Sequence, residues 1–271
     1  MGRIADAFAR RAKENRKLLI PYLVAGDPDL ETSLSVMHDM VRAGADLIEL
    51  GVPFTDPEAE GPVIQLAHER ALVNNVSLRD SIELVRSFRE LDKQTPVILM
   101  GYLNPLDAMG YETFADSASD AGVDGVLIVN MPPEEGMQLR GALAAKELDV
   151  IYLLSPTTTD KRAAFVCSQA GGFVYYVSLK GTTGSATMIN FDDVEARVNH
   201  LRAFCDVPMV VGFGIKDGTS AARVAVFADG SVVGTAIVNI FGAHQQNPKK
   251  IGPLVSELLA DMRQQMDAVN S

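Results

Sequence analysis

The side chains best suited to acid–base chemistry lie in the segment Leu47–Gln65. It begins with the apolar run Leu47-Ile48-Glu49-Leu50, which has the character of a strand buried on both faces except that Glu49 places a carboxyl group inside it. A lone buried carboxylate is costly unless it is paired or protonated. Since α/β folds place their chemistry at the C-terminal ends of strands, the position of Glu49 indicates a catalytic acid or base. The loop that follows adds three more carboxylates, at Asp56, Glu58 and Glu60.

A second chemical signal comes from glycines that follow the last three strand-like runs. They occur in Gly181-Thr182-Thr183-Gly184, in Gly212-Phe213-Gly214, and in Gly234-Thr235-Ala236, which opens a short helix-like run, Ile237–Phe241. Free backbone N–H groups and a helix dipole bind phosphate, and barrels often do so after strands seven and eight. Any one of these loops alone could be an ordinary tight turn, but the three together predict a phosphate site.

The elements that must position these residues are short β-branched runs alternating with helical patterns. Eight strand candidates occur, at Leu18–Val24, Leu47–Leu50, Val97–Met100, Gly125–Val129, Val150–Leu154, Phe173–Ser178, Met209–Val211 and Ser231–Val233. Eight helical segments are expected, at Leu30–Ala43, Leu78–Leu91, Pro105–Ala121, Pro133–Lys146, Asp160–Ala170, Phe191–Phe204, Gly218–Ala228 and Pro253–Met266.

This arithmetic predicts an α/β fold, a single (β/α)8 TIM barrel spanning residues 1–271. The stretch Arg3–Asn15 is predicted to form an extra helix before the first strand. A doubly wound open sheet is the alternative architecture, but Ala25-Gly26-Asp27-Pro28 after strand one lacks the G-x-G-x-x-G turn that such folds usually carry.

The composition of the chain limits the kinds of partner and the location to be expected. The net charge is −11, and no Lys/Arg block is dense enough to bind nucleic acid. No apolar run is long enough to cross a bilayer and the N-terminus does not resemble a secretory leader, so the expected location is the cytoplasm. There Cys167 and Cys205 are expected to be free thiols in or near the core. The four histidines show no metal-like spacing and are expected to be structural or at the surface: His38, His68, His200 and His244.

Several motifs in combination resemble the tryptophan synthase alpha chain family. They are Pro21-Tyr22-Leu23-Val24-Ala25-Gly26-Asp27-Pro28, Glu49-Leu50-Gly51-Val52-Pro53-Phe54-Thr55-Asp56-Pro57, Gly61-Pro62, Met100-Gly101-Tyr102-Leu103-Asn104-Pro105, Pro132-Pro133-Glu134-Glu135, Phe173-Val174-Tyr175-Tyr176-Val177-Ser178, Gly181-Thr182-Thr183-Gly184, Gly212-Phe213-Gly214-Ile215 and Gly234-Thr235-Ala236. The resemblance covers nearly the whole chain.

The resemblance implies a retro-aldol lyase in tryptophan biosynthesis that cleaves indole-3-glycerol phosphate to indole and glyceraldehyde 3-phosphate. It implies that indole passes to a beta chain in an alpha2-beta2 complex. The alpha chain would carry no cofactor and no metal, because pyridoxal phosphate belongs to the beta chain.

The resemblance also assigns roles to residues. Glu49 matches the family's acid/base at indole C3 and the glycerol hydroxyl, and burial should raise its pKa. Glu60 stands where the family has Asp as its second carboxylate. The remaining matches are substrate-binding Tyr22, Met100, Tyr102, Tyr175, Thr183 and Phe213, and phosphate-binding Gly184, Gly214, Gly234 and Thr235.

Departures from the family pattern leave alternatives open. The longer Glu60 moves a carboxylate by over ~1 Å, a shift that can cost ~10²-fold in rate. Asn130, where the family commonly has Asp, removes an anionic hydrogen-bond acceptor from the segment that faces the beta chain. The chain could therefore be a weakly active or non-catalytic subunit that regulates the beta chain. It could also be a stand-alone lyase, or a phosphate-binding barrel of other specificity. A structural Glu49 paired with Lys or Arg is the competing reading of that residue.

Overall fold

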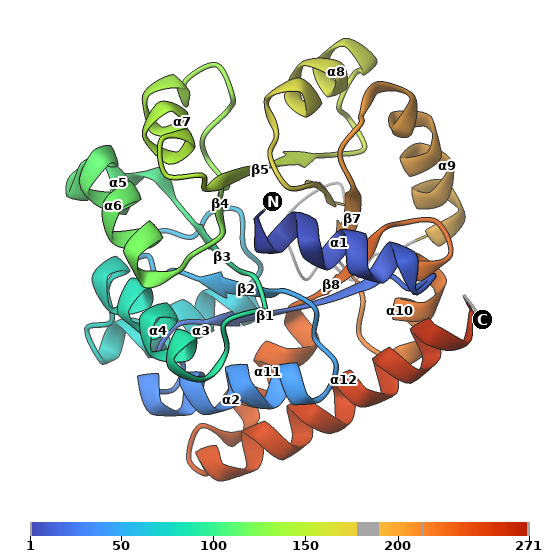
Figure 1. The fold of residues 1–271 in the computed structure, drawn as a ribbon. Coiled ribbons are helices and arrows are strands. Elements are labelled where there is room, and N and C mark those ends of the chain that lie inside the picture. The colour runs from blue at the N-terminus through green and yellow to red at the C-terminus, as the bar shows by residue number, and fades with distance from the viewer. Residues whose placement is uncertain (1, 178–189, 213, 270–271) are drawn as a thin grey trace.

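A computed structural model describes residues 2–177, 190–212 and 214–269, and the strands in it form a closed barrel in sequence order (Figure 1). All neighbouring strands are parallel, and β1 pairs with β8 to close the barrel. The strands are β1 (Leu18–Val24), β2 (Ile48–Gly51), β3 (Val97–Gly101), β4 (Gly125–Ile128), β5 (Asp149–Leu154), β6 (Val174–Val177), β7 (Met209–Gly212) and β8 (Gly230–Val233). The predicted (β/α)8 barrel is confirmed.

The helices ring the outside of the barrel, except the N-terminal one, which lies across one end of it (Figure 1). They are α1 (Arg3–Lys13), α2 (Leu30–Arg42), α3 (Pro62–Val73), α4 (Leu78–Leu91), α5 (Leu103–Met109), α6 (Tyr111–Ala121), α7 (Met137–Ala144), α8 (Asp160–Gln169), α9 (Phe191–Leu201), α10 (Gly218–Ala225), α11 (Thr235–His244) and α12 (Ile251–Ala268). In the described part of the chain, the 3-10 helix η1 (Arg202–Phe204) follows α9 and the 3-10 helix η2 (Pro248–Lys250) precedes α12. The expected N-terminal helix and the short helix after strand eight are α1 and α11.

The expected helix at Pro133–Lys146 is shorter in the structure, as α7 (Met137–Ala144), and two larger differences occur earlier in the chain. The single helix expected over Pro105–Ala121 is broken at Gly110 into α5 and α6, because Gly110 takes a φ of 87°, which helical residues do not adopt. No helix is expected from the sequence between strand two and Leu78, whereas the structure has the 12-residue helix α3 in that interval.

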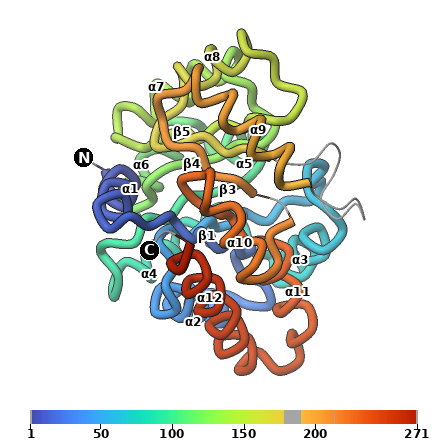
Figure 2. The backbone as a smooth tube through the Cα atoms, turned by 90° about the vertical axis from the view of Figure 1, so that its right-hand side faces the viewer, coloured from blue at the N-terminus to red at the C-terminus, as the bar shows by residue number. Residues whose placement is uncertain are grey.

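The barrel interior holds a cluster of apolar side chains, and α1 closes one end of it. Ile4 and Ala7 of α1 are buried against the inward-facing side chains Leu18, Ile20, Leu47, Ile98, Leu127, Ile151, Phe173, Tyr175, Val210 and Val232. Figure 2 shows α1 beyond one end of the barrel, with α3 and α11 lying next to each other toward the other end. Because one end is plugged, chemistry is left to the opposite end, where the strands finish.

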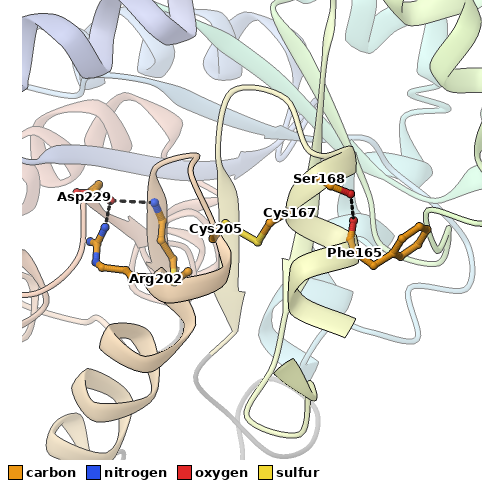
Figure 3. Close-up of a disulfide and its surroundings, with 7 residues drawn as sticks. Phe165, Cys167, Ser168, Arg202, Cys205 and Asp229 are labelled. Atoms are coloured by element: carbon orange, nitrogen blue, oxygen red, sulfur yellow. Dashed lines mark hydrogen bonds and ion pairs between the residues drawn. A yellow bond between two sulfur atoms is a disulfide. The ribbon is translucent and has the colours of Figure 1, made fainter. Parts of the chain in front are cut away.

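The cysteines correct a prediction. Cys167, near the end of α8, and Cys205, just after η1, form a disulfide rather than two free thiols (Figure 3). Their Cα atoms are 5.3 Å apart, within the range that disulfides span. Arg202 of η1 binds Asp229 beside them at 2.9 Å. The spacing of the two cysteines in the sequence gave no sign of this contact, because it depends on how α8 and η1 pack.

Candidate active site

Glu49 of β2 points into the barrel because it shares the inward parity of Leu47, the residue directly before that strand. Its residue exposure is 1%, and β-sheet register sets it between Tyr22 of β1 and Ile98 of β3. Among the described residues, no donor or cation reaches its Oε1 atom. In that part of the chain, Glu49 therefore has none of the Lys or Arg partners that a purely structural role would require.

Glu60 is another buried carboxyl at this end of the barrel. It is 5% exposed and lies at the end of the loop that joins β2 to α3. Burial raises the pKa of Glu60 to about 7. Burial, followed by the charge of Glu60, raises the pKa of Glu49 to about 8, in the direction that the sequence predicted. Near neutral pH Glu49 is thus mainly a proton donor, whereas Glu60 is poised between donor and acceptor.

Two tyrosines of the barrel strands lie near these carboxyls. Tyr22 of β1 and Tyr175 of β6 are both buried, and both sense the charge of Glu49 and of Glu60. Burial, followed by those charges, holds the pKa of each phenol well above its usual value, so both hydroxyls stay protonated. They can therefore donate hydrogen bonds to a bound ligand or to an ionised carboxylate.

Glycines make room for both hydroxyl groups. A Cβ atom added at Gly51 would lie 2.3 Å from the Tyr22 hydroxyl, and one added at Gly212 would lie 1.8 Å from the Tyr175 hydroxyl. Neither position can accept a side chain without moving the tyrosine. Each tyrosine ring therefore packs against the backbone of a glycine in the neighbouring strand.

The loop that carries Glu60 is tied to its surroundings by side chains. Tyr102, directly after β3, accepts a hydrogen bond from the Ala59 N–H at 2.9 Å, and its ring stacks on Phe54 with centroids 4.9 Å apart. Gln65 of α3 donates its side-chain amide to the Glu60 carbonyl at 2.9 Å. Tyr102, expected from sequence to bind substrate, thus also holds this loop.

One residue of the site was not singled out by the sequence. His68 of α3, grouped there with structural or surface histidines, is buried, and its Nδ1 and Nε2 atoms lie 3.1 Å from the Phe54 nitrogen and 3.4 Å from the Tyr22 oxygen. Its place in the sequence gave no signal, because the helix that carries it was not predicted.

The expected phosphate end is only partly described. Gly234 precedes α11 and Thr235 is its first residue, so the free N–H groups of this helix point beyond the end of β8. Gly214, after β7, adopts a left-handed φ of 69°. Met100 lies on β3, half-buried against the core. Three other predicted site residues lie outside the described residues: Thr183, Gly184 and Phe213.

Asn130, in the loop after β4, has a local role. Its side-chain oxygen accepts a hydrogen bond from the Leu103 N–H at 2.8 Å, and Leu103 is the first residue of α5. The amide therefore satisfies one of the free donors at that helix start.

A parallel (β/α)8 barrel with two protonatable carboxyls buried where its strands end defines a barrel enzyme of the acid–base type. A family model described as tryptophan synthase alpha chain matches residues 8–267. The tryptophan synthase alpha chain of Thioalkalivibrio sulfidiphilus is 54% identical over 267 residues, covering 98% of this chain and 100% of that one.

Solved structures agree with the family model. A tryptophan synthase alpha chain from Legionella pneumophila has a TM-score of 0.92 at 42% identity, covering 100% of this chain and 99% of that one. A chain of tryptophan synthase from M. tuberculosis, in its aminoacrylate-bound form, has a TM-score of 0.85 at 32% identity, covering 97% of this chain and 100% of that one.

The chain belongs to the tryptophan synthase alpha chain family. It is thus a lyase of tryptophan synthesis, in which the alpha chain uses no cofactor and pyridoxal phosphate belongs to the beta chain. Among the described residues, no group of three His, Cys, Asp or Glu side chains could hold a metal ion, and no helix is long and apolar enough to cross a membrane.

Proposed function

We propose that Glu49 and Glu60 are the acid–base pair for retro-aldol cleavage of indole-3-glycerol phosphate. The observation that carries this proposal is the burial of two carboxyls at one end of the barrel, with pKa values raised to about 8 and about 7. Groups whose pKa values bracket the working pH exchange protons efficiently.

The two carboxyls divide the proton transfers. Protonated Glu49 gives its proton to indole C3, while Glu60 carboxylate takes the proton from the indole nitrogen. Glu49, now ionised, accepts the proton of the glycerol hydroxyl as the bond between C3 and the glycerol chain breaks, with its electron pair returning to the ring. The nitrogen then regains its proton from Glu60, releasing indole and glyceraldehyde 3-phosphate with both carboxyls in their starting states.

Substrate binding follows the same layout. We propose that Tyr22, Tyr102, Tyr175 and Met100 enclose the indole ring and glycerol chain, and that Gly214, Gly234 and Thr235 bind the phosphate at the start of α11. The left-handed Gly214 and the helix start that follows β8 support the phosphate assignment. The proposal extends to Thr183, Gly184 and Phe213 on their family match alone.

We propose that the chain works in an alpha2-beta2 complex with a beta chain, in the cytoplasm. Exposed apolar side chains support a partner surface: Met137 of α7 and Phe165 of α8 stand on neighbouring helices (Figure 1). A hollow of about 330 Å³ lies between the loops after β4 and β5 and is lined by Asn130, Pro132 and Arg162.

The test is indole release from indole-3-glycerol phosphate, measured for the chain alone and with a cognate beta chain. We expect slow release alone, strong activation by the partner, and loss of release in both Glu49→Gln and Glu60→Gln. Fast release without the partner would support the stand-alone lyase. No release in either assay, with phosphate ligand still bound, would leave only the regulatory role.

The Glu60→Asp variant tests whether the longer side chain is suited to its place. Because the loop around Glu60 is held at Ala59 and at the Glu60 carbonyl, we expect the shorter carboxylate to fall out of reach and release to drop by ~10²-fold. A gain in rate would instead show that Glu60 impairs the native enzyme.

A further inference from the structure

The strongest unassigned feature of the site is His68, a buried imidazole that the proton transfers above do not use. It lies on α3, it is 2% exposed, and both of its ring nitrogens face polar groups of the site. A buried polar side chain of this kind is retained at a cost unless its hydrogen bonds are satisfied.

The hydrogen bonds of His68 define its protonation state. The Phe54 N–H can only donate, so Nδ1 must accept and the ring proton sits on Nε2. Burial lowers the pKa of His68 to about 4, so the ring is neutral at physiological pH. The Nε2–H group then donates to the Tyr22 oxygen, whose own proton remains available to the carboxyl side of the pocket.

These contacts connect the loop that bears Glu60 to the barrel wall. Tyr22 is fixed on β1, directly opposite Glu49 in the sheet register. Phe54 lies near the start of the loop, while Tyr102 and Gln65 hold its end at Ala59 and Glu60. His68 is therefore the tie at the start of the loop, and the other two side chains are ties at its end.

We propose that His68 is a positioning residue that sets the place of the Glu60 carboxyl by bridging the Phe54 amide to the Tyr22 hydroxyl. The proposal rests on the catalytic role proposed for Glu60. It predicts that His68 acts on kcat rather than on phosphate affinity, because its contacts are at the loop after β2 and not at the loops after β7 and β8.

The experiment compares substitutions that keep different halves of the bridge. In His68→Asn the side-chain oxygen lies near the place of Nδ1 and can still accept a hydrogen bond from the Phe54 N–H. In His68→Gln the longer side chain reaches the Tyr22 hydroxyl instead. His68→Ala keeps neither hydrogen bond. In the complex with the beta chain, we expect His68→Ala and His68→Gln to lower kcat by ~10²-fold with KM nearly unchanged. We expect His68→Asn to recover at least ~10-fold of that loss, because the loop tie is restored.

A matched control and a second readout separate positioning from folding. His200→Ala removes an exposed histidine bound to Asp160 on the outside of the barrel, and it should leave kcat unchanged. Hydrogen exchange at the Phe54 amide should be faster in His68→Ala and stay protected in His68→Asn.

Outcomes that overturn the proposal are distinct from failure of the proposed function. Full activity of a folded His68→Ala variant would overturn the role of His68 and leave the role of Glu60 standing. The same would follow if His68→Ala and His68→Asn lost equal activity while hydrogen exchange at the Phe54 amide stayed unchanged. Full activity of Glu60→Gln overturns both, since there would be no catalytic carboxyl to position.

Discussion

At the scale of single residues, the site depends on neutral groups placed where charges would be costly. Glu49 holds its proton because burial and the nearby Glu60 both oppose ionisation. Tyr22 and Tyr175 keep their protons for the same reasons. Neutral groups at these three positions let an indole ring pack against them without the cost of desolvating a charge there.

The seating of Tyr175 against Gly212 gives a first prediction. In Gly212→Ala the new Cβ would lie 1.8 Å from the tyrosine hydroxyl, so the ring must leave its place beside the carboxyls. We expect indole release to fall by ~10²-fold. The control is Gly141→Ala in α7, where nothing lies within 4 Å of the added carbon; both variants are assayed without the beta chain, because α7 is part of the proposed partner surface. This control should keep full activity and gain up to ~1 kcal/mol of stability. An active Gly212→Ala enzyme would show that the position of Tyr175 does not matter.

At the scale of elements, the barrel strands were predictable and the helix behind the catalytic loop was not. Strand ends came within one or two residues because each strand is a short apolar run bounded by turns. In α3, however, Leu66 and Val73 are apolar yet 53% and 80% exposed, so the hydrophobic period expected of an amphipathic helix is blurred. Because the sequence did not predict α3, it did not point to His68 as a site residue either. The contact of His68 with the Phe54 amide exists only in the folded chain.

An ion pair joins α3 to the loop after β1. Arg70 donates two hydrogen bonds of 2.7 Å to Asp27, which is 1% exposed. Desolvation raises the pKa of Asp27 even though Arg70 opposes the shift. Removing the cation therefore leaves a costly buried carboxylate.

We expect Arg70→Leu to lower the free energy of unfolding by ~3–5 kcal/mol, because one partner of a buried pair is lost. Arg42→Leu is the matched control, since Arg42 of α2 pairs with Asp39 at the surface and should change stability by less than ~1 kcal/mol. Denaturant unfolding of the two variants measures the difference. Equal effects would mean that Asp27 finds another partner or is protonated.

At the scale of the whole molecule, stability should depend on the protons of the active site. In the unfolded chain Glu49 would ionise near pH 4.5, whereas in the folded chain its pKa is about 8. Below pH 4.5 both states hold the proton and the stabilisation is fully present. Between these two values only the folded state holds it, so the free energy of unfolding falls as pH rises, by ~1.4 kcal/mol per pH unit for this group.

Glu49→Gln should remove that dependence. The free energy of unfolding of the variant minus that of the native chain should become more positive by ~2–3 kcal/mol as the pH rises from 5.5 to 7.5. Urea unfolding at the two pH values measures the change. Parallel pH profiles for the native chain and the variant would contradict the raised pKa.

The sequence thus predicted the barrel, its extra helices and the inward-facing Glu49, because each depends on local period and strand parity. The ties that hold Glu60, the bridge through His68 and the disulfide depend on contacts between segments far apart in the chain. No local pattern encodes those contacts, which is why Cys167 and Cys205 were expected to be free thiols.

The link between Cys167 and Cys205 has a consequence for a cleaved chain. The disulfide closes residues 167–205 into a covalent ring, so a protease that cuts once within it opens the ring without separating the two halves. Such a nicked chain should migrate as one species on a non-reducing gel and as two fragments after reduction. A Cys205→Ser chain cut at the same place should give two fragments on both gels. Two fragments from the native chain without reductant would mean that the thiols had stayed apart where the protein was made.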